Sequence, residues 1–182
     1  MPAEPAHAEA EIEILLVEDN PSDAELAVRE LRRHKFANVI HVIGDGVEAL
    51  DFIFCRGAYQ GRSFASPPKV ILLDLKLPKM DGLQILAAIR ADARTRAIPV
   101  VMMTSSSEQR DLIESYKIGV NAFIQKPVDF DDFRRVIERV GMFWLAVNQP
   151  PPAEVFGLTE DAARKQHESL ESTSTLRGSI PS

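Results

Sequence analysis

The chain has 182 residues, 45% of them hydrophobic, and a formal net charge of −6 at pH 7. This length suits one domain with some residues left over. The negative net charge argues against a protein that binds nucleic acid electrostatically. The single cysteine, Cys55, excludes an internal disulfide and favours a reducing compartment. The first residues lack an apolar signal region, and no apolar run approaches the roughly 18 residues of a membrane span. We therefore expect a cytoplasmic protein that binds neither nucleic acid nor membrane.

Short apolar runs alternate with helix-start signals along most of the chain. The runs that predict strands are 12–17, 39–43, 70–74, 98–104 and 121–124. Each is followed by residues that favour a helix start, in order Asn20-Pro21, Asp45-Gly46, Asp81, Ser105 or Ser106, and Asp129. The fourth helix should end at Gly119. This alternation predicts an α/β domain over 12–147, with a parallel sheet covered by helices on both faces.

Three segments lie outside this alternation. Residues 1–11 are polar and are predicted to form a loose arm, and 56–69 form a long loop rich in Gly, Ser and Pro. After the last helix, 148–182 begin with a proline run and read as a polar tail, with a short helix over 160–170.

The last helix carries an apolar stripe that we expect to cover the sheet. It is made of Phe130, Phe133, Ile137, Val140, Trp144 and Val147.

Polar residues stand where the predicted strands end. In an open parallel sheet, ligands bind outside the carboxyl ends of the strands. The first strand ends in Glu18 and Asp19, the third in Asp74 and the fourth in Thr104, while Lys126 follows the fifth. The fold should therefore gather three carboxylates, one hydroxyl and one ammonium at one edge. Singly, each has a structural explanation, because Asp19 suits a helix start and a surface lysine is normally solvated.

Three neighbouring carboxylates repel one another unless a cation joins them. Mg²⁺ takes oxygen ligands, including one or two carboxylates, and keeps several waters. Lys126 and Thr104 supply groups that suit phosphoryl oxygens, so the set is typical of a phosphoryl-transfer site in which a metal-bound carboxylate attacks phosphorus and forms an aspartyl phosphate. The sequence has neither a GxxxxGK[ST] loop nor GxGxxG. The Asp-x-Asp element of haloacid-dehalogenase-type phosphatases is also absent, because Lys76 stands two places after Asp74.

Four segments resemble the signatures of the receiver domain of response regulators in two-component systems. They are LLVEDNPSDAEL, ILLDLKLPKMDG, PVVMMTSS and NAFIQKPVD, and they occur in the family's order. The resemblance covers 12–147 and implies a flavodoxin-like fold with strand order 2-1-3-4-5. It also implies that the protein is a phosphoacceptor signalling domain, with no enzyme activity beyond its own phosphorylation and dephosphorylation.

The resemblance implies a role for each matching residue. Asp74 would accept the phosphoryl group from a sensor histidine kinase, and Thr104 and Lys126 would bind its oxygens. Mg²⁺ would be held by Glu18, Asp19 and Asp74 with the backbone carbonyl of Lys76. Thr104 and Phe123 stand at the switch positions, although Phe123 cannot donate the hydrogen bond of the Tyr often found there. The Lys126–Pro127 bond is expected to be cis.

The long loop, the LPKMDG turn and the FW pair before the proline run resemble single-domain regulators paired with bacterial and cyanobacterial phytochrome kinases. We expect no output domain in the tail. We also expect a homodimer through the fourth helix, fifth strand and fifth helix. Two other functions remain open: a phosphorylation-independent adaptor, and a flavodoxin-like electron carrier. The acidic pair after the first strand disfavours the carrier, because it would repel a flavin phosphate.

Overall fold

The computed structural model of the protein describes residues 13–37 and 39–156. Its centre is a five-stranded sheet in which every neighbouring pair is parallel, with the order β2-β1-β3-β4-β5. This confirms the predicted fold class and strand order. The strands are β1 (Ile14–Val17), β2 (Ile40–Ile43), β3 (Val70–Asp74), β4 (Val100–Thr104) and β5 (Ala122–Gln125).

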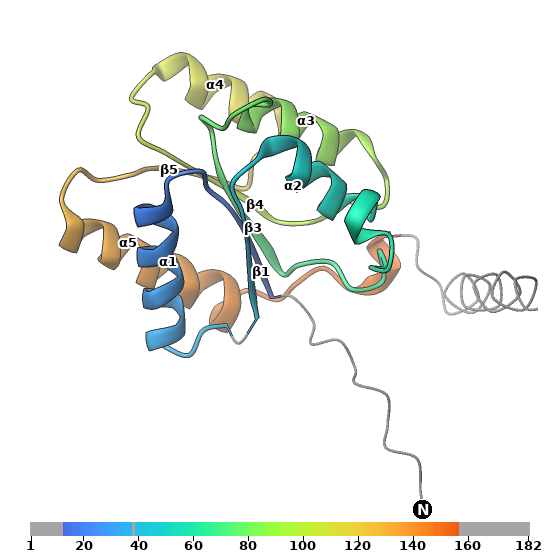
Figure 1. Ribbon diagram of the computed structural model, residues 1–182, viewed down its shortest axis with the longest axis horizontal. Coiled ribbons are helices and arrows are strands. Elements are labelled where there is room, and N and C mark those ends of the chain that lie inside the picture. Colours follow the sequence, from blue (N-terminus) through green and yellow to red (C-terminus); the bar gives the residue numbers. More distant parts are fainter. Residues whose placement is uncertain (1–12, 38, 157–182) are drawn as a thin grey trace, which may run out of the picture.

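Helices cover both faces of the sheet (Figure 1). One face carries α1 and α5, and the other carries α2, α3 and α4. The α-helices are α1 (Pro21–Arg33), α2 (Gly46–Ile53), α3 (Gly82–Ala91), α4 (Gln109–Ile118) and α5 (Phe130–Gly141). Shorter turns are the 3₁₀ helices η1 (Gly57–Tyr59) and η3 (Ala153–Phe156) and the π-helix η2 (Met142–Val147). None of the helices in 13–37 and 39–156 is long and apolar enough to cross a bilayer.

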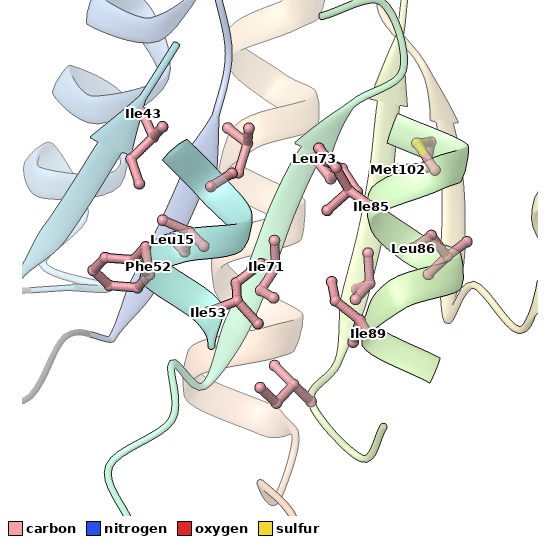
Figure 2. Packing of buried hydrophobic residues seen from close by; sticks show 14 of the residues in the cluster. Leu15, Ile43, Phe52, Ile53, Ile71, Leu73, Ile85, Leu86, Ile89 and Met102 are labelled. Carbon is pink, nitrogen blue, oxygen red and sulfur yellow. The ribbon is translucent and has the colours of Figure 1, made fainter. Parts of the chain in front are cut away.

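The two faces of the sheet have separate cores because successive strand residues point to opposite sides. In the central strand β3, Ile71 and Leu73 belong to the cluster under α2 and α3, whereas Val70 and Leu72 belong to the cluster under α1 and α5. Figure 2 shows the first cluster, with Ile71 and Leu73 near side chains of the two helices above them. A strand buried on both faces therefore reads as an unbroken apolar run.

Local capping residues start four of the five α-helices as predicted. The side chains of Asn20, Asp45, Asp81 and Asp129 accept hydrogen bonds from backbone N–H groups of the first helical turn. The predicted start of α4 was wrong, because its N-cap position is Glu108 and neither Ser105 nor Ser106 caps it. Gly119 ends α4 as predicted, with φ of 107°, a conformation that glycine adopts without steric cost.

The apolar stripe of the last helix covers the sheet from Phe133 to the half-buried Trp144, but not at its two ends. Phe133, Ile137 and Val140 are buried, but Phe130 and Val147 are 56% and 60% exposed. Phe130 lies at the first helical position, where the guanidinium of Arg29 stands 6.0 Å from its ring centre. At the other end, the backbone changes to the π-helix η2 after Gly141, which alters the helical periodicity on which the stripe depends.

The segment after α5 is part of the folded structure. It runs beneath the sheet from the α5 side to the α2 side, where η3 ends (Figure 1). Phe156 is 4% exposed and belongs to the core cluster under α2 and α3. It borders a cavity of about 170 Å³ whose walls come from the end of the 56–69 loop and from the proline run. The expected loose arm at 1–11 and the helix at 160–170 lie outside the described residues.

We predict that Phe156→Ala lowers the free energy of unfolding by about 3 kcal/mol, because it removes a buried ring and leaves a cavity. Val155→Ala is the matched control, since Val155 is 48% exposed and should matter little. Urea unfolding of the three proteins measures the difference. Equal unfolding midpoints for the wild type and Phe156→Ala would show that the segment after α5 adds nothing to the core.

Candidate functional site

Three carboxylates meet at the carboxyl edge of the sheet. Glu18 and Asp19 directly follow β1, and Asp74 is the last residue of the adjacent strand β3. One oxygen from each of the three lies within 4.8 Å of the other two. Glu18 and Asp74 are buried, at 6% and 8% exposure, whereas Asp19 is exposed to solvent. The structure therefore brings together the three acids that the sequence placed at strand ends.

The ammonium group of Lys126 lies among these acids. Its Nζ is 2.5 Å from Glu18 Oε2 and 3.2 Å from Asp74 Oδ2. It also donates to Asp23 Oδ2 at 3.2 Å. Lys126 follows β5 and is 9% exposed, so these ion pairs form in a region that water screens poorly.

Burial and charge act in opposite directions on this cluster. Burial raises the pKa of the Glu18 carboxyl, and the hydrogen bond and charge of Lys126 only partly offset this rise. For Lys126, burial acts to lower the pKa, but its hydrogen bond to Glu18 and the three nearby negative charges raise it above its usual value. One ammonium faces several carboxylates, so the site retains an excess of negative charge.

Asp23 is a member of this site that the sequence reasoning missed. It is an acidic residue of the first turn of α1, and its contact with Lys126 spans 103 positions of sequence. Helix spacing gave no signal for it, because Asp19 precedes the N-cap residue Asn20 and lies outside α1. Its side chain is 34% exposed, so it borders the buried cluster rather than lying within it.

Thr104 lies beside the cluster and is fully buried. Its carbonyl accepts the backbone N–H of Lys126 at 2.7 Å, and its hydroxyl oxygen accepts the backbone N–H of Ser106 at 3.0 Å. Phe123 is half-buried on β5 and packs against the core cluster under α2 and α3. The Lys126–Pro127 bond is trans, in contrast to the predicted cis form. Trans is the intrinsically favoured isomer, and Lys126 reaches the acids from it.

The loop after β3 approaches its strand so closely that it requires glycine. A Cβ on Gly82 would stand 2.4 Å from the carbonyl oxygen of Asp74. Asp81 caps α3 in a capping box with Gln84, so the second aspartate of the segment is the structural one, as expected. Between them, the backbone N–H of Lys76 donates to Asp74 Oδ1 at 3.3 Å. The turn therefore holds the backbone N–H of Lys76 next to the carboxylate of Asp74.

We predict that Lys126→Met lowers the free energy of unfolding by about 3 kcal/mol in the presence of EDTA, because it leaves buried carboxylates without their counter-charge. Lys69→Met is the control, since Lys69 pairs with Glu13 at 2.8 Å but is 41% exposed. Its loss should cost less than about 1 kcal/mol. Urea unfolding tests both variants, and equal losses would contradict the importance assigned to the buried cluster.

The chain is similar to several known response regulators. Response regulator Rcp1 of Synechocystis sp. is 36% identical over 141 residues, covering 77% of this chain and 93% of Rcp1. The crystal structure of its Mn²⁺-bound form has a TM-score of 0.72 at 34% identity, and the match covers 76% of this chain and 98% of that one.

Two further solved structures are similar to the chain. The phosphorylated cyanobacterial phytochrome response regulator RcpA has a TM-score of 0.73 at 34% identity, covering 79% of this chain and 100% of that one. The bacteriophytochrome response regulator AtBRR is 49% identical with a TM-score of 0.59, covering 75% of this chain and 96% of that one. The family model for the response regulator receiver domain matches residues 14–138. The chain therefore belongs to the family of response regulator receiver domains.

Proposed function

We propose that Asp74 is the phosphoacceptor of this receiver domain. The observation that carries the proposal is the position of its carboxylate, which is nearly buried at the edge of the sheet and 3.2 Å from the ammonium of Lys126. No other aspartate in 13–37 and 39–156 combines burial, a strand-end position and a lysine contact. Asp81, seven residues later, is committed to capping α3.

We further propose that Glu18, Asp19 and Asp74 hold Mg²⁺, with the backbone carbonyl of Lys76 as an additional ligand. The donor set fits, because three carboxylate oxygens lie within 4.8 Å of one another and the cluster has excess negative charge. The Mn²⁺-bound structure of the similar protein Rcp1 supports a divalent cation in such a site. When bound, the cation would neutralise charge on the incoming phosphoryl group.

The chain's own residues can support the transfer step. One carboxylate oxygen of Asp74 forms a bond to phosphorus, the P–N bond of a phosphohistidine breaks, and its electron pair returns to the imidazole nitrogen. Lys126 lies where its positive charge can stabilise the phosphoryl oxygens, and it is already positioned by Glu18 and Asp23. The Thr104 hydroxyl accepts one hydrogen bond and retains its own proton to donate to a phosphoryl oxygen. We assign Thr104 and Phe123 to the switch that follows.

Phosphorylation by a small-molecule donor tests the role of Asp74. Incubation with acetyl phosphate and Mg²⁺ should add one phosphate to the wild-type protein, as measured by intact mass. Asp74→Asn should gain none, because an amide is not a nucleophile for this reaction. Asp81→Asn, the control in the same loop, should be phosphorylated normally, since asparagine also caps helices.

If Asp74→Asn still gains a phosphate, the phosphoacceptor is another residue. A wild-type protein that gains no phosphate would favour a phosphorylation-independent adaptor.

We propose that the phosphoryl donor is a sensor histidine kinase of the bacteriophytochrome type. The similar proteins RcpA and AtBRR are phytochrome and bacteriophytochrome response regulators.

Beside the site, Val128 is fully exposed and Phe130 is 56% exposed, which provides an apolar surface next to Lys126. Val128→Asp should slow transfer from a bacteriophytochrome kinase about tenfold or more, and leave labelling by acetyl phosphate unchanged. Equal slowing with both donors would place the defect in the site itself.

We propose that phosphorylation promotes a homodimer through α4, β5 and α5. Three large apolar side chains of α4 are exposed, namely Leu112, Ile113 and Tyr116, at 37%, 45% and 55%. Such a row on one helix is typical of a contact surface.

Light scattering should report a dimer with acetyl phosphate and Mg²⁺, and Ile113→Asp should remain monomeric. Val47→Asp is the control, because Val47 is 43% exposed on α2. A wild-type monomer in both states would rule out this dimer.

A further inference from the structure

The turn between β2 and α2, residues 44–46, lies against two loops of the candidate site. A Cβ on Gly44 would stand 3.6 Å from the carbonyl oxygen of Glu18, at the start of the loop that follows β1. A Cβ on Gly46 would stand only 2.3 Å from the carbonyl oxygen of Met80, in the loop that follows β3. The space between the turn and the second loop is therefore too small for any side chain at Gly46.

Asp45, in the middle of this turn, connects the start of α2 to the loop after β3. Its Oδ1 accepts the backbone N–H groups of Val47 and Glu48 at 2.8 and 3.1 Å, and so caps α2. Its Oδ2 forms an ion pair with the ammonium of Lys79. Hydrogen bonding within this pair lowers the pKa of Asp45 and raises the pKa of Lys79, so both are charged at neutral pH.

The backbone of the loop is unusual where it meets the turn. Lys79 has a φ of 65°, in the left-handed region that residues other than glycine rarely adopt. Beside it, the backbone N–H of Met80 bonds to the carbonyl of Pro78 at 2.8 Å. Such a conformation persists only where the surrounding structure holds it. The ion pair with Asp45 and the close contact with Gly46 hold the loop at this point.

The same loop begins at the candidate site. Asp74 ends β3, and the backbone N–H of Lys76 donates to Asp74 Oδ1 at 3.3 Å. The carbonyl of Leu75 accepts the backbone N–H of Gly82 at 2.8 Å, which joins the two ends of the loop. Because the loop is closed in this way, a shift in its middle also changes the position of Lys76.

We propose that the turn 44–46 sets the position of the loop after β3 relative to the acidic pair after β1, and that Asp45 is a positioning residue for the cation site through its ion pair with Lys79. Asp45 is not one of the three acids whose oxygens lie within 4.8 Å of one another, so its effect is indirect. The proposal rests on the function proposed above, in which those acids and the carbonyl of Lys76 hold the cation. Residues that orient metal ligands in this way affect metal affinity without touching the metal.

Binding of Mn²⁺, measured by the loss of the free-ion signal in electron paramagnetic resonance, tests this proposal without a phosphorylation step. Gly46→Ala should weaken Mn²⁺ binding about tenfold, because its methyl group must displace the carbonyl of Met80. Gly61→Ala is the matched control, since a Cβ there meets nothing within 4 Å, and it should bind Mn²⁺ as the wild type does. Urea unfolding in EDTA shows whether each variant is folded.

Lys79→Met separates positioning from simple electrostatics, and it decides the question if Gly46→Ala does not fold. Removing a positive charge near the acids would by itself strengthen cation binding. Loss of the ion pair that holds the loop should instead weaken Mn²⁺ binding about threefold to fivefold, the range expected for an exposed pair. Lys79→Arg should restore the wild-type affinity, because it keeps the charge. Lys117→Met is the control, since Lys117 is 66% exposed and pairs with Glu114 at 3.0 Å within α4.

Asp45→Asn tests the other end of the ion pair. Asparagine also caps helices, so α2 should keep its start, and unfolding in EDTA should stay close to that of the wild type. Mn²⁺ binding should weaken as it does in Lys79→Met. A wild-type protein that binds no Mn²⁺ contradicts the proposed function. Normal Mn²⁺ binding by the wild type, with unchanged or tighter binding by Lys79→Met, overturns the positioning role alone, as does an equal loss in Lys117→Met.

Discussion

The contact of one buried ammonium with carboxylates from three elements is the interaction on which the site depends. Lys126 comes from the end of β5, Glu18 and Asp74 from the ends of β1 and β3, and Asp23 from α1. Like charges at this separation repel, and a poorly screened region strengthens both the repulsion and the attraction. The fold tolerates the repulsion because Lys126 offsets part of it. The remaining negative charge favours the binding of a cation.

The rest of the domain holds these strand ends in register. Residue pairing places Val17 of β1 beside Leu73 of β3, so Glu18 and Asp74 emerge side by side at the same edge. The two apolar clusters make a slip of one residue costly, because it would exchange the faces of every buried side chain. Phe156 extends the core cluster under α2 and α3 from a segment beyond α5. The stability of the sheet therefore also depends on residues far from the site.

The α-helices differ in how their starts are held. Four α-helices carry their own side-chain caps, and α4 does not. Its start is held by Ser106, which also bonds to Thr104 beside the acids. Leu112, Ile113 and Tyr116, the exposed large apolar side chains of α4, follow this start.

The sequence alone determined the features that arise from local interactions. Strand positions followed from apolar runs, and Asn20, Asp45, Asp81 and Asp129 were recognised as caps because a cap bonds to residues two or three positions away. The rule that ligands meet at strand ends then placed Glu18, Asp19, Asp74, Thr104 and Lys126 at one edge, and the structure brings the three acids and Lys126 into contact there.

Tertiary structure alone decided four features. Ser105 and Ser106 looked like caps, but Ser106 bonds instead to Thr104 and Asp111, which left Glu108 at the start of α4. Asp23 joined Lys126 across 103 positions, Phe156 entered the core, and Phe130 remained exposed. The last three results depend on which distant groups become neighbours after the sheet forms, whereas Ser106 bonds to residues two and five positions away. Periodicity and capping rules describe only neighbours along the chain, and so they carry no information about those contacts.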